Sequence, residues 1–147
     1  MTTLLPTDAH MTAAFDELLA DVTNLLESTR AQKPLDRDEL RFWSRQLNAL
    51  NKSQYHWASG VRPIRCGACW LVPSASIGGA LVYRLCQLGG IWICNCTAGE
   101  RGVLCHHHMT VNVIERAAEL EMLAEDEAEQ RLSLKISETR AKYMQAA

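Results

Sequence analysis

The chain gathers three of its six cysteines and three of its five histidines into one short stretch, WICNCTAGERGVLCHHH, at residues 92–108. Cys94, Cys96 and Cys105 lie there with the histidine run 106–108, and the other cysteines and histidines are scattered upstream. Thiol and imidazole groups are the usual ligands of zinc, and in a reducing compartment clustered cysteines are more often metal ligands than disulfides. The stretch therefore either binds a metal ion or is a patch of buried cysteine beside a histidine run.

A cytoplasmic location is expected. The N-terminal residues lack the basic and then apolar order of a secretory signal, and no apolar run approaches the roughly 20 residues of a membrane-spanning helix. We therefore expect reduced thiols and no membrane partner. The length of 147 residues and the 48% share of hydrophobic residues suit one cooperative globular domain with accessory helices.

Two amphipathic helices are predicted in residues 1–60. Apolar residues at helical spacing mark the first helix, over 12–30: Phe15, Leu18, Leu19, Val22, Leu25 and Leu26. Pro34 ends this helix, and Asp36 with Glu39 three residues later forms the pattern of a capping box that opens the second. Gly60 is a plausible end of that helix. The two helices are expected to pack as an antiparallel hairpin.

The remaining chain predicts a sheet followed by a helix. Glycine and proline punctuate short runs with strand character at 68–72, 80–86 and 91–96, and Gly89-Gly90 suits a tight hairpin turn. Helical spacing returns after His107 and predicts a long C-terminal helix, with a weaker pattern beyond residue 128. The expected fold is α+β: a helical hairpin over 1–60, a small three-stranded antiparallel sheet with one structural zinc over 61–110, and a long helix over 111–147.

The cysteine spacing can supply a zinc site if the third strand bends at its end. Cys94 and Cys96 share a strand face, with side-chain origins about 7 Å apart, whereas sulfurs on one tetrahedral zinc lie about 3.8 Å apart. The following loop, 97–104, contains two glycines and can fold back over the site. Cys105 lies where the last helix is expected to begin, and a helix N-terminus favours the negative charge of thiolates.

Geometry leaves the fourth ligand open. Within a regular helix, residues three apart share a face, which would pair Cys105 with His108. If Cys105 lies in the turn before the helix, His107 can converge with it instead. His106 is the least favoured, because adjacent helical residues point to different sides.

The motif C94-x-C96, eight residues and C105-x-H107 resembles the SWIM-type zinc finger, whose pattern is C-x-C, a variable spacer and C-x-H. Residues 67–115 look like the version found in small bacterial, plasmid and phage proteins, which also has W-x-V-x-S (Trp70, Val72, Ser74) and a strand tyrosine (Tyr83). The resemblance implies one structural zinc held by Cys94, Cys96, Cys105 and His107. The family usually has alanine three residues past the histidine, where this chain has Thr110. Family members are thought to bind DNA or other proteins.

Other arrangements of the cysteines compete with this site. Cys66 and Cys69 form a CxxC that could join Cys94 and Cys96 as a zinc ribbon, but Cys105 and the histidines would then be unexplained. A redox role for this CxxC is less favoured, because no βαβ pattern surrounds it. Cys86 is expected to be a small buried apolar residue.

An enzymatic role is not expected. A nucleophilic dyad of Cys105 and His107 would lack a recognisable third group that orients the histidine. Four protein ligands also close a zinc site to water, so we expect neither catalysis nor a small-molecule substrate.

The charge pattern leaves two partner classes open. Residues 61–110 contain Arg62, Arg65, Arg84 and Arg101 against Glu100 alone, whereas both flanking segments are acidic. These arginines are candidate contacts for nucleic acid, in particular for DNA phosphates. The alternative partner is a protein. In that case this chain would be an adaptor or inhibitor, of a kind that a mobile element could encode, and would bind its partner through the acidic helices.

Overall fold

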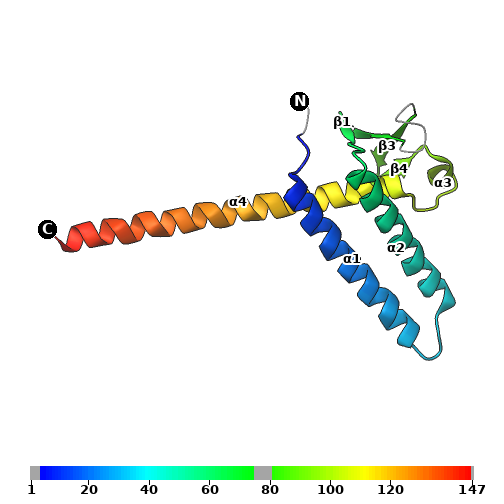
Figure 1. Ribbon diagram of the computed structural model, residues 1–147, viewed down its shortest axis with the longest axis horizontal. Coiled ribbons are helices and arrows are strands. Elements are labelled where there is room, and N and C mark those ends of the chain that lie inside the picture. The colour runs from blue at the N-terminus through cyan, green and yellow to red at the C-terminus, as the bar shows by residue number, and fades with distance from the viewer. Residues whose placement is uncertain (1–3, 75–80, 147) are drawn as a thin grey trace.

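The α+β class expected from the sequence is confirmed by the computed structural model, which describes residues 4–74 and 81–146. Two N-terminal helices form a hairpin, a small sheet follows, and a long helix ends the chain (Figure 1). The helices are α1 (Asp8–Ala31), α2 (Arg37–Ala58), α3 (Thr97–Glu100) and α4 (His106–Gln145). The strands are β1 (Ile64–Cys66), β2 (Cys69–Pro73), β3 (Val82–Leu88) and β4 (Ile91–Cys94).

The ends of α2 follow the signals in the sequence. The Asp36 carboxylate caps the helix by accepting hydrogen bonds of 3.0 Å from the backbone N–H groups of Asp38 and Glu39. The reciprocal half of the capping box is replaced, because the Glu39 carboxylate accepts a bond from the indole of Trp43 instead. At the other end Gly60 has a φ of 95°, a conformation that glycine adopts without steric cost.

Within the described residues the sheet has four antiparallel strands in the order β1-β2-β3-β4, so the prediction of three strands was one short. The missed strand, β1, is a three-residue edge strand directly after Pro63, too short to show an alternating pattern. The strand predicted at 80–86 is observed from residue 82 to 88, and residue 80 of the prediction lies outside the described residues. The strand predicted at 91–96 ends at Cys94. Gly89 and Gly90 form the expected hairpin turn, with φ values of 58° and 82°.

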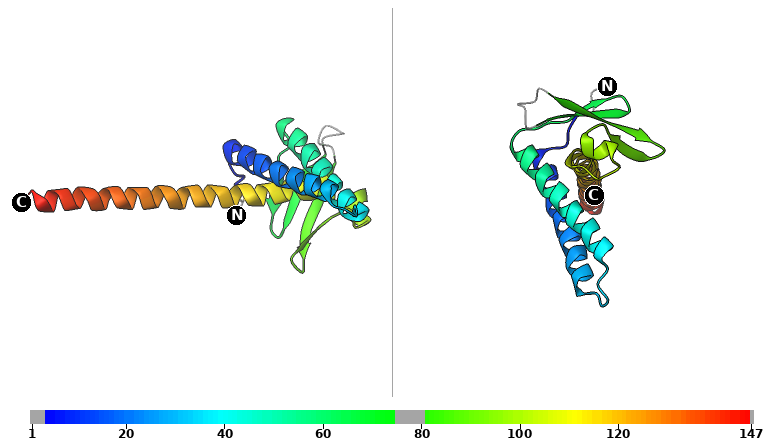
Figure 2. Two further views of the ribbon diagram at one scale, coloured as in Figure 1. Left: turned by 90° about the horizontal axis from the view of Figure 1, so that it is seen from below. Right: turned by 90° about the vertical axis from the view of Figure 1, so that its right-hand side faces the viewer.

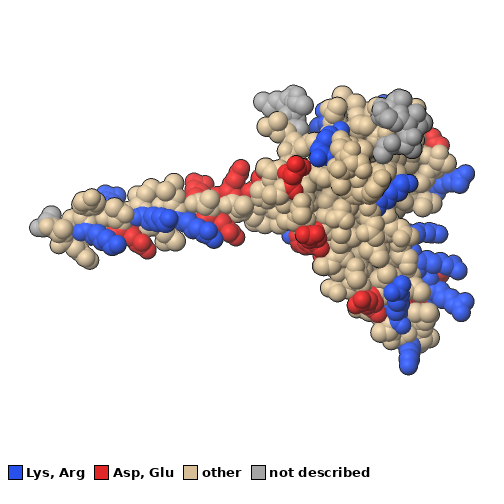
Figure 3. Space-filling view, viewed as in Figure 1, with Lys and Arg blue, Asp and Glu red and all other residues tan. Residues whose placement is uncertain are grey.

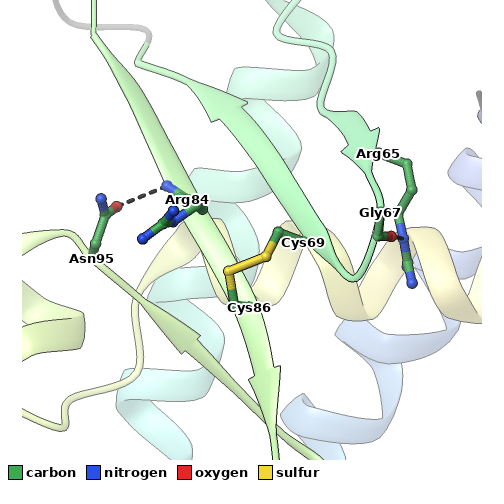
Figure 4. Close-up of a disulfide and its surroundings, with 6 residues drawn as sticks. All are labelled: Arg65, Gly67, Cys69, Arg84, Cys86 and Asn95. Atoms are coloured by element: carbon green, nitrogen blue, oxygen red, sulfur yellow. Dashed lines mark hydrogen bonds between the residues drawn. A yellow bond between two sulfur atoms is a disulfide. The ribbon is translucent and has the colours of Figure 1, made fainter.

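Cys86 forms a disulfide with Cys69, so the prediction that it is a small buried apolar residue was wrong (Figure 4). The two residues lie directly opposite each other in the register of β2 and β3, with their Cα atoms 4.3 Å apart. Cysteines directly opposite each other on neighbouring strands can be bridged, because their Cα atoms are well below the limit of about 7 Å for a disulfide. The sequence spacing alone did not reveal this, since the register of two strands is a tertiary property.

The first turns of α4 lie between the helical hairpin and the sheet (Figure 2). Their buried residues therefore face more than one side: His107, Met109, Thr110, Val111, Val113, Ile114 and Ala117. The apolar members of this set share one core with apolar residues from α1, α2 and all but the first strand. Where the helix leaves this core, Arg116 donates two hydrogen bonds of 2.7 and 3.0 Å to the carboxylate of Glu17 on α1.

No helix among the described residues has the length and apolar character needed to cross a membrane.

A buried hydroxyl pair links α2 to α4. The oxygens of Ser53 and Thr110 lie 2.6 Å apart, and the Thr110 hydroxyl also donates to the carbonyl of His106 at 2.8 Å. Because that bond uses the single hydroxyl proton of Thr110, Ser53 is the donor to Thr110. The threonine at this position thus accepts a hydrogen bond from a serine on the neighbouring helix.

The hydroxyl pair predicts an asymmetry between two substitutions. Thr110→Val keeps the shape but removes the acceptor of the buried Ser53 hydroxyl, and should lower the free energy of unfolding by about 1–3 kcal/mol. Ser53→Ala should cost less, because Thr110 keeps its bond to the His106 carbonyl. The double variant should recover part of the loss of Thr110→Val. Urea denaturation of the three variants measures these differences, and equal costs for the two single variants would contradict the assignment.

Candidate metal centre

Four buried side chains with metal-binding groups meet where β4, α3 and α4 converge. They are those predicted from the motif, Cys94, Cys96, Cys105 and His107, and their ligand atoms all lie within 4.8 Å of one another. Sulfurs on one tetrahedral metal ion are about 3.8 Å apart, so small movements would bring the four onto a shared ion. The cluster could therefore hold one metal ion.

The bend that this site requires occurs directly after Cys94. β4 ends there, and Asn95 exchanges two hydrogen bonds with the backbone of Arg84 on β3, one through its side-chain oxygen at 2.7 Å (Figure 4). Cys96 follows as the N-cap of the short helix α3, in place of the strand position expected for it. Because of this turn, the side chains of Cys94 and Cys96 converge and do not keep the wide separation they would have along a regular strand.

Gly99 is required by close packing more than by backbone freedom. A Cβ atom at this position would collide with the carbonyl group of Cys94, and that group belongs to rigid backbone. The other loop glycine, Gly102, has a φ of 67° and supplies the left-handed turn. The loop therefore packs onto the strand end that carries the first ligand.

The position of Cys105 resolves the geometric choice between His107 and His108. Cys105 has the extended conformation of an N-cap, and α4 begins at His106. His107, in the first turn, is buried and places its Nδ1 atom 3.7 Å from the sulfur of Cys94. His108 is half-buried and lies outside the cluster. This is the arrangement expected if Cys105 precedes the helix.

Neighbouring rings fix the orientation of His107. Its ring centroid lies 4.4 Å from that of Tyr83 on β3 and 4.0 Å from that of His106. His106 in turn meets the ring of His56 on α2 at 4.6 Å. Burial, with a smaller effect from the charge of His107, lowers the pKa of His106 to about 3, so that this neighbouring ring is neutral at ordinary pH.

The cysteine sulfurs at the two helix starts accept hydrogen bonds from the backbone. The N–H groups of Gly99 and His108 donate to the sulfurs of Cys96 and Cys105, at 3.3 and 3.4 Å. A hydrogen bond from the Cys94 thiol lowers the pKa of Cys105, and the same contact together with burial raises the pKa of Cys94. Metal binding at such a site displaces the remaining thiol protons.

The zinc-ribbon alternative is excluded by the pairing of its cysteines. Cys69 is in the disulfide with Cys86, and Cys66 is exposed on the edge strand and outside the cluster. The same disulfide leaves the CxxC without two free thiols in this state. The group that could hold a metal ion is therefore the one that includes Cys105 and a histidine.

The four arginines proposed as nucleic-acid contacts have different surroundings. Arg62 stacks on Trp57, with its guanidinium carbon 3.9 Å from the ring centroid, and lies 3.6 Å from a carboxylate oxygen of Asp8. Arg65 donates to the carbonyl of Gly67 at 2.9 Å (Figure 4). Arg84 and Arg101 are exposed. Two of the four thus have local structural contacts.

A basic stripe on α2 was missed in the sequence. Arg37, Arg41, Arg45 and Lys52 are all exposed, and their spacing of four, four and seven residues places them on one narrow face of the helix. Figure 3 shows basic side chains along the outer edge of the hairpin, on the α2 side. The signal was present as R-x-x-x-R-x-x-x-R, but the acidic total of residues 1–60 concealed it.

The stripe reaches the metal centre. Arg45 and Lys52 line a surface pocket of about 420 Å³ together with Cys96 and His106. The ligand-bearing loops and the basic side chains therefore share one surface.

Comparison of the chain with models of protein families, with curated proteins and with solved structures finds no match.

Substitution of one ligand should release the metal. Cys96→Ser should cost at least about 3 kcal/mol of metal-linked stability, because a structural site contributes its binding energy to folding. For a chain of this size that corresponds to a fall in Tm of roughly 10 °C. Cys66→Ser, which changes an exposed thiol outside the cluster, is the matched control. Elemental analysis and thermal unfolding check both; full metal in Cys96→Ser would contradict the assignment.

The histidine run provides a second test. His107→Ala should lose metal, whereas His108→Ala should retain it, because His108 contributes its backbone N–H to the Cys105 sulfur and alanine keeps that group. Metal content after equilibration with a competing chelator distinguishes the two variants. Metal loss only in His108→Ala would show that the helix starts earlier than Cys105.

Proposed function

We propose that this protein is a structural zinc module, similar to the SWIM type, that binds nucleic acid through the basic stripe of α2. The observation that carries the proposal is the position of Arg45 and Lys52 beside the metal centre. In this proposal the zinc ion does no chemistry. It fixes the start of α4 and the end of β4, against which α2 is held.

The donor set favours zinc among the common metals. Three cysteine sulfurs and one imidazole nitrogen form a Cys₃His set, which suits a tetrahedral zinc ion with no open position. Calcium and magnesium prefer oxygen ligands, which this cluster lacks among its four members. A closed site also supports a structural over a catalytic role.

The shape and charge of the stripe suit a phosphate backbone. From Arg37 to Lys52 it extends about 22 Å along the helix, at 1.5 Å per residue. Arginine makes bidentate contacts with phosphate, and such contacts give affinity without reading base sequence. An overall net charge of −2 limits the attraction to this surface, so we expect moderate affinity that depends strongly on salt.

The proposal predicts which charges matter. Arg41→Glu with Arg45→Glu should abolish the mobility shift of a generic duplex DNA while metal content stays intact. For the wild type, neutralising up to four phosphates gives a slope of log affinity against log salt of about −3 to −4.

The matched control is Arg84→Glu with Arg101→Glu, which makes the same change in charge on the zinc module. Retained binding in this variant supports the α2 stripe, and lost binding would assign the contact to the arginines proposed from the sequence. A wild type that shifts neither DNA nor RNA at low salt would contradict the function and favour a protein partner.

A further inference from the structure

Most of α4 lies outside the body of the protein. Every residue from position 122 to 146 is exposed, and the helical part of this segment, 122–145, forms an arm about 36 Å long (Figure 1). Helices in proteins draw most of their stability from packing one face against another element. The arm therefore presents a surface on which such packing can occur.

One face of this arm is apolar. Its residues follow one another at spacings of four and then seven, which keeps them on one broad side of the helix: Ala124, Ala128, Leu132, Ile136 and Tyr143. We call this set the arm stripe. Its large members are well exposed, Leu132 and Ile136 at 59% and 60%. Leu123 and Leu134 are exposed as well but lie outside the stripe.

Side-chain size changes along the arm stripe. The half nearer the body has Ala124 and Ala128, whereas the outer half has Leu132 and Ile136. In an antiparallel pair of arms that crosses near residue 130, Ala128 lies opposite Leu132 of the second copy and Ala124 lies opposite Ile136. A small residue then faces a large one in both pairs, which fills this part of the interface evenly. A parallel pair would place alanine against alanine and isoleucine against isoleucine.

Charge changes along the arm in the same way. Residues 119–129 contain six acidic side chains and no lysine or arginine, whereas residues 130–145 contain four basic side chains and one acidic one. Figure 3 shows acidic side chains near the root of the arm and mostly basic ones toward its end. A parallel pair would align like charges over both halves. An antiparallel pair places each acidic half against a basic half.

We propose that two copies of this chain associate through their α4 arms, in antiparallel orientation and with the arms crossing near residue 130. The flank of the arm stripe fits the same crossing point. Glu127, Arg131 and Lys135 follow one another at four-residue spacing along this flank, and Glu127 lies 3.8 Å from Arg131 within one chain. In an antiparallel pair the same flanks face each other, so Glu127 of one copy faces Arg131 and Lys135 of the second. This association requires neither the zinc nor the nucleic acid of the proposed function.

A charge swap tests the pairing in the full-length protein without nucleic acid. Lys135→Glu and Glu127→Lys should each weaken self-association about tenfold or more, because each places like charges together at two symmetric positions. The double variant should restore it. These two residues are eight positions apart, about 12 Å along one helix, so a rescue reports contact between copies and not within one.

Sedimentation over a range of protein concentrations measures the association of all four proteins. Leu132→Asp, at an exposed position, should give a monomer that keeps its metal, and so separates loss of pairing from loss of fold. A wild type that stays monomeric up to its limit of solubility would overturn the proposal. So would a double variant no better associated than the single ones. Loss of DNA binding alone would leave it unaffected.

Discussion

Four buried groups that prefer a charged or polar partner meet at the point where a strand ends and two helices begin. Burying such groups is unfavourable unless they are satisfied, and here they come from the end of β4, the start of α3 and the start of α4. The rest of the fold depends on this convergence. It fixes the first turn of α4, and α4 is the element against which both the helical hairpin and the sheet pack.

Local patterns in the sequence predicted what local physics determines. The alternation of residues 91–94 placed Trp92 and Cys94 on the buried face, and Asp36 and Gly60 marked the ends of α2 as expected. The candidate ligands also came from the motif. The motif predicted them because two local features bring them together: the bend directly after Cys94 and the start of α4 directly after Cys105.

Tertiary pairing was beyond the reach of the same patterns. β1 is a strand because β2 lies beside it, and Cys86 meets Cys69 because of the register of β2 and β3. The role of Gly99 depends on the approach of the loop to Cys94. Thr110, where the SWIM pattern usually has alanine, also depends on a tertiary contact, since its partner Ser53 lies 57 positions earlier in the chain. The membership in a SWIM-like group stays a prediction from the motif.

Cys69 has a cysteine opposite it on each side of its strand, Cys66 on β1 and Cys86 on β3. Six thiols in one small sheet and loop allow many wrong pairings during oxidation. A metal ion bound early would withdraw Cys94, Cys96 and Cys105 from that competition. The remaining choice would then be between two neighbours of a single strand residue, so that metal supply would determine which covalent form of the chain accumulates.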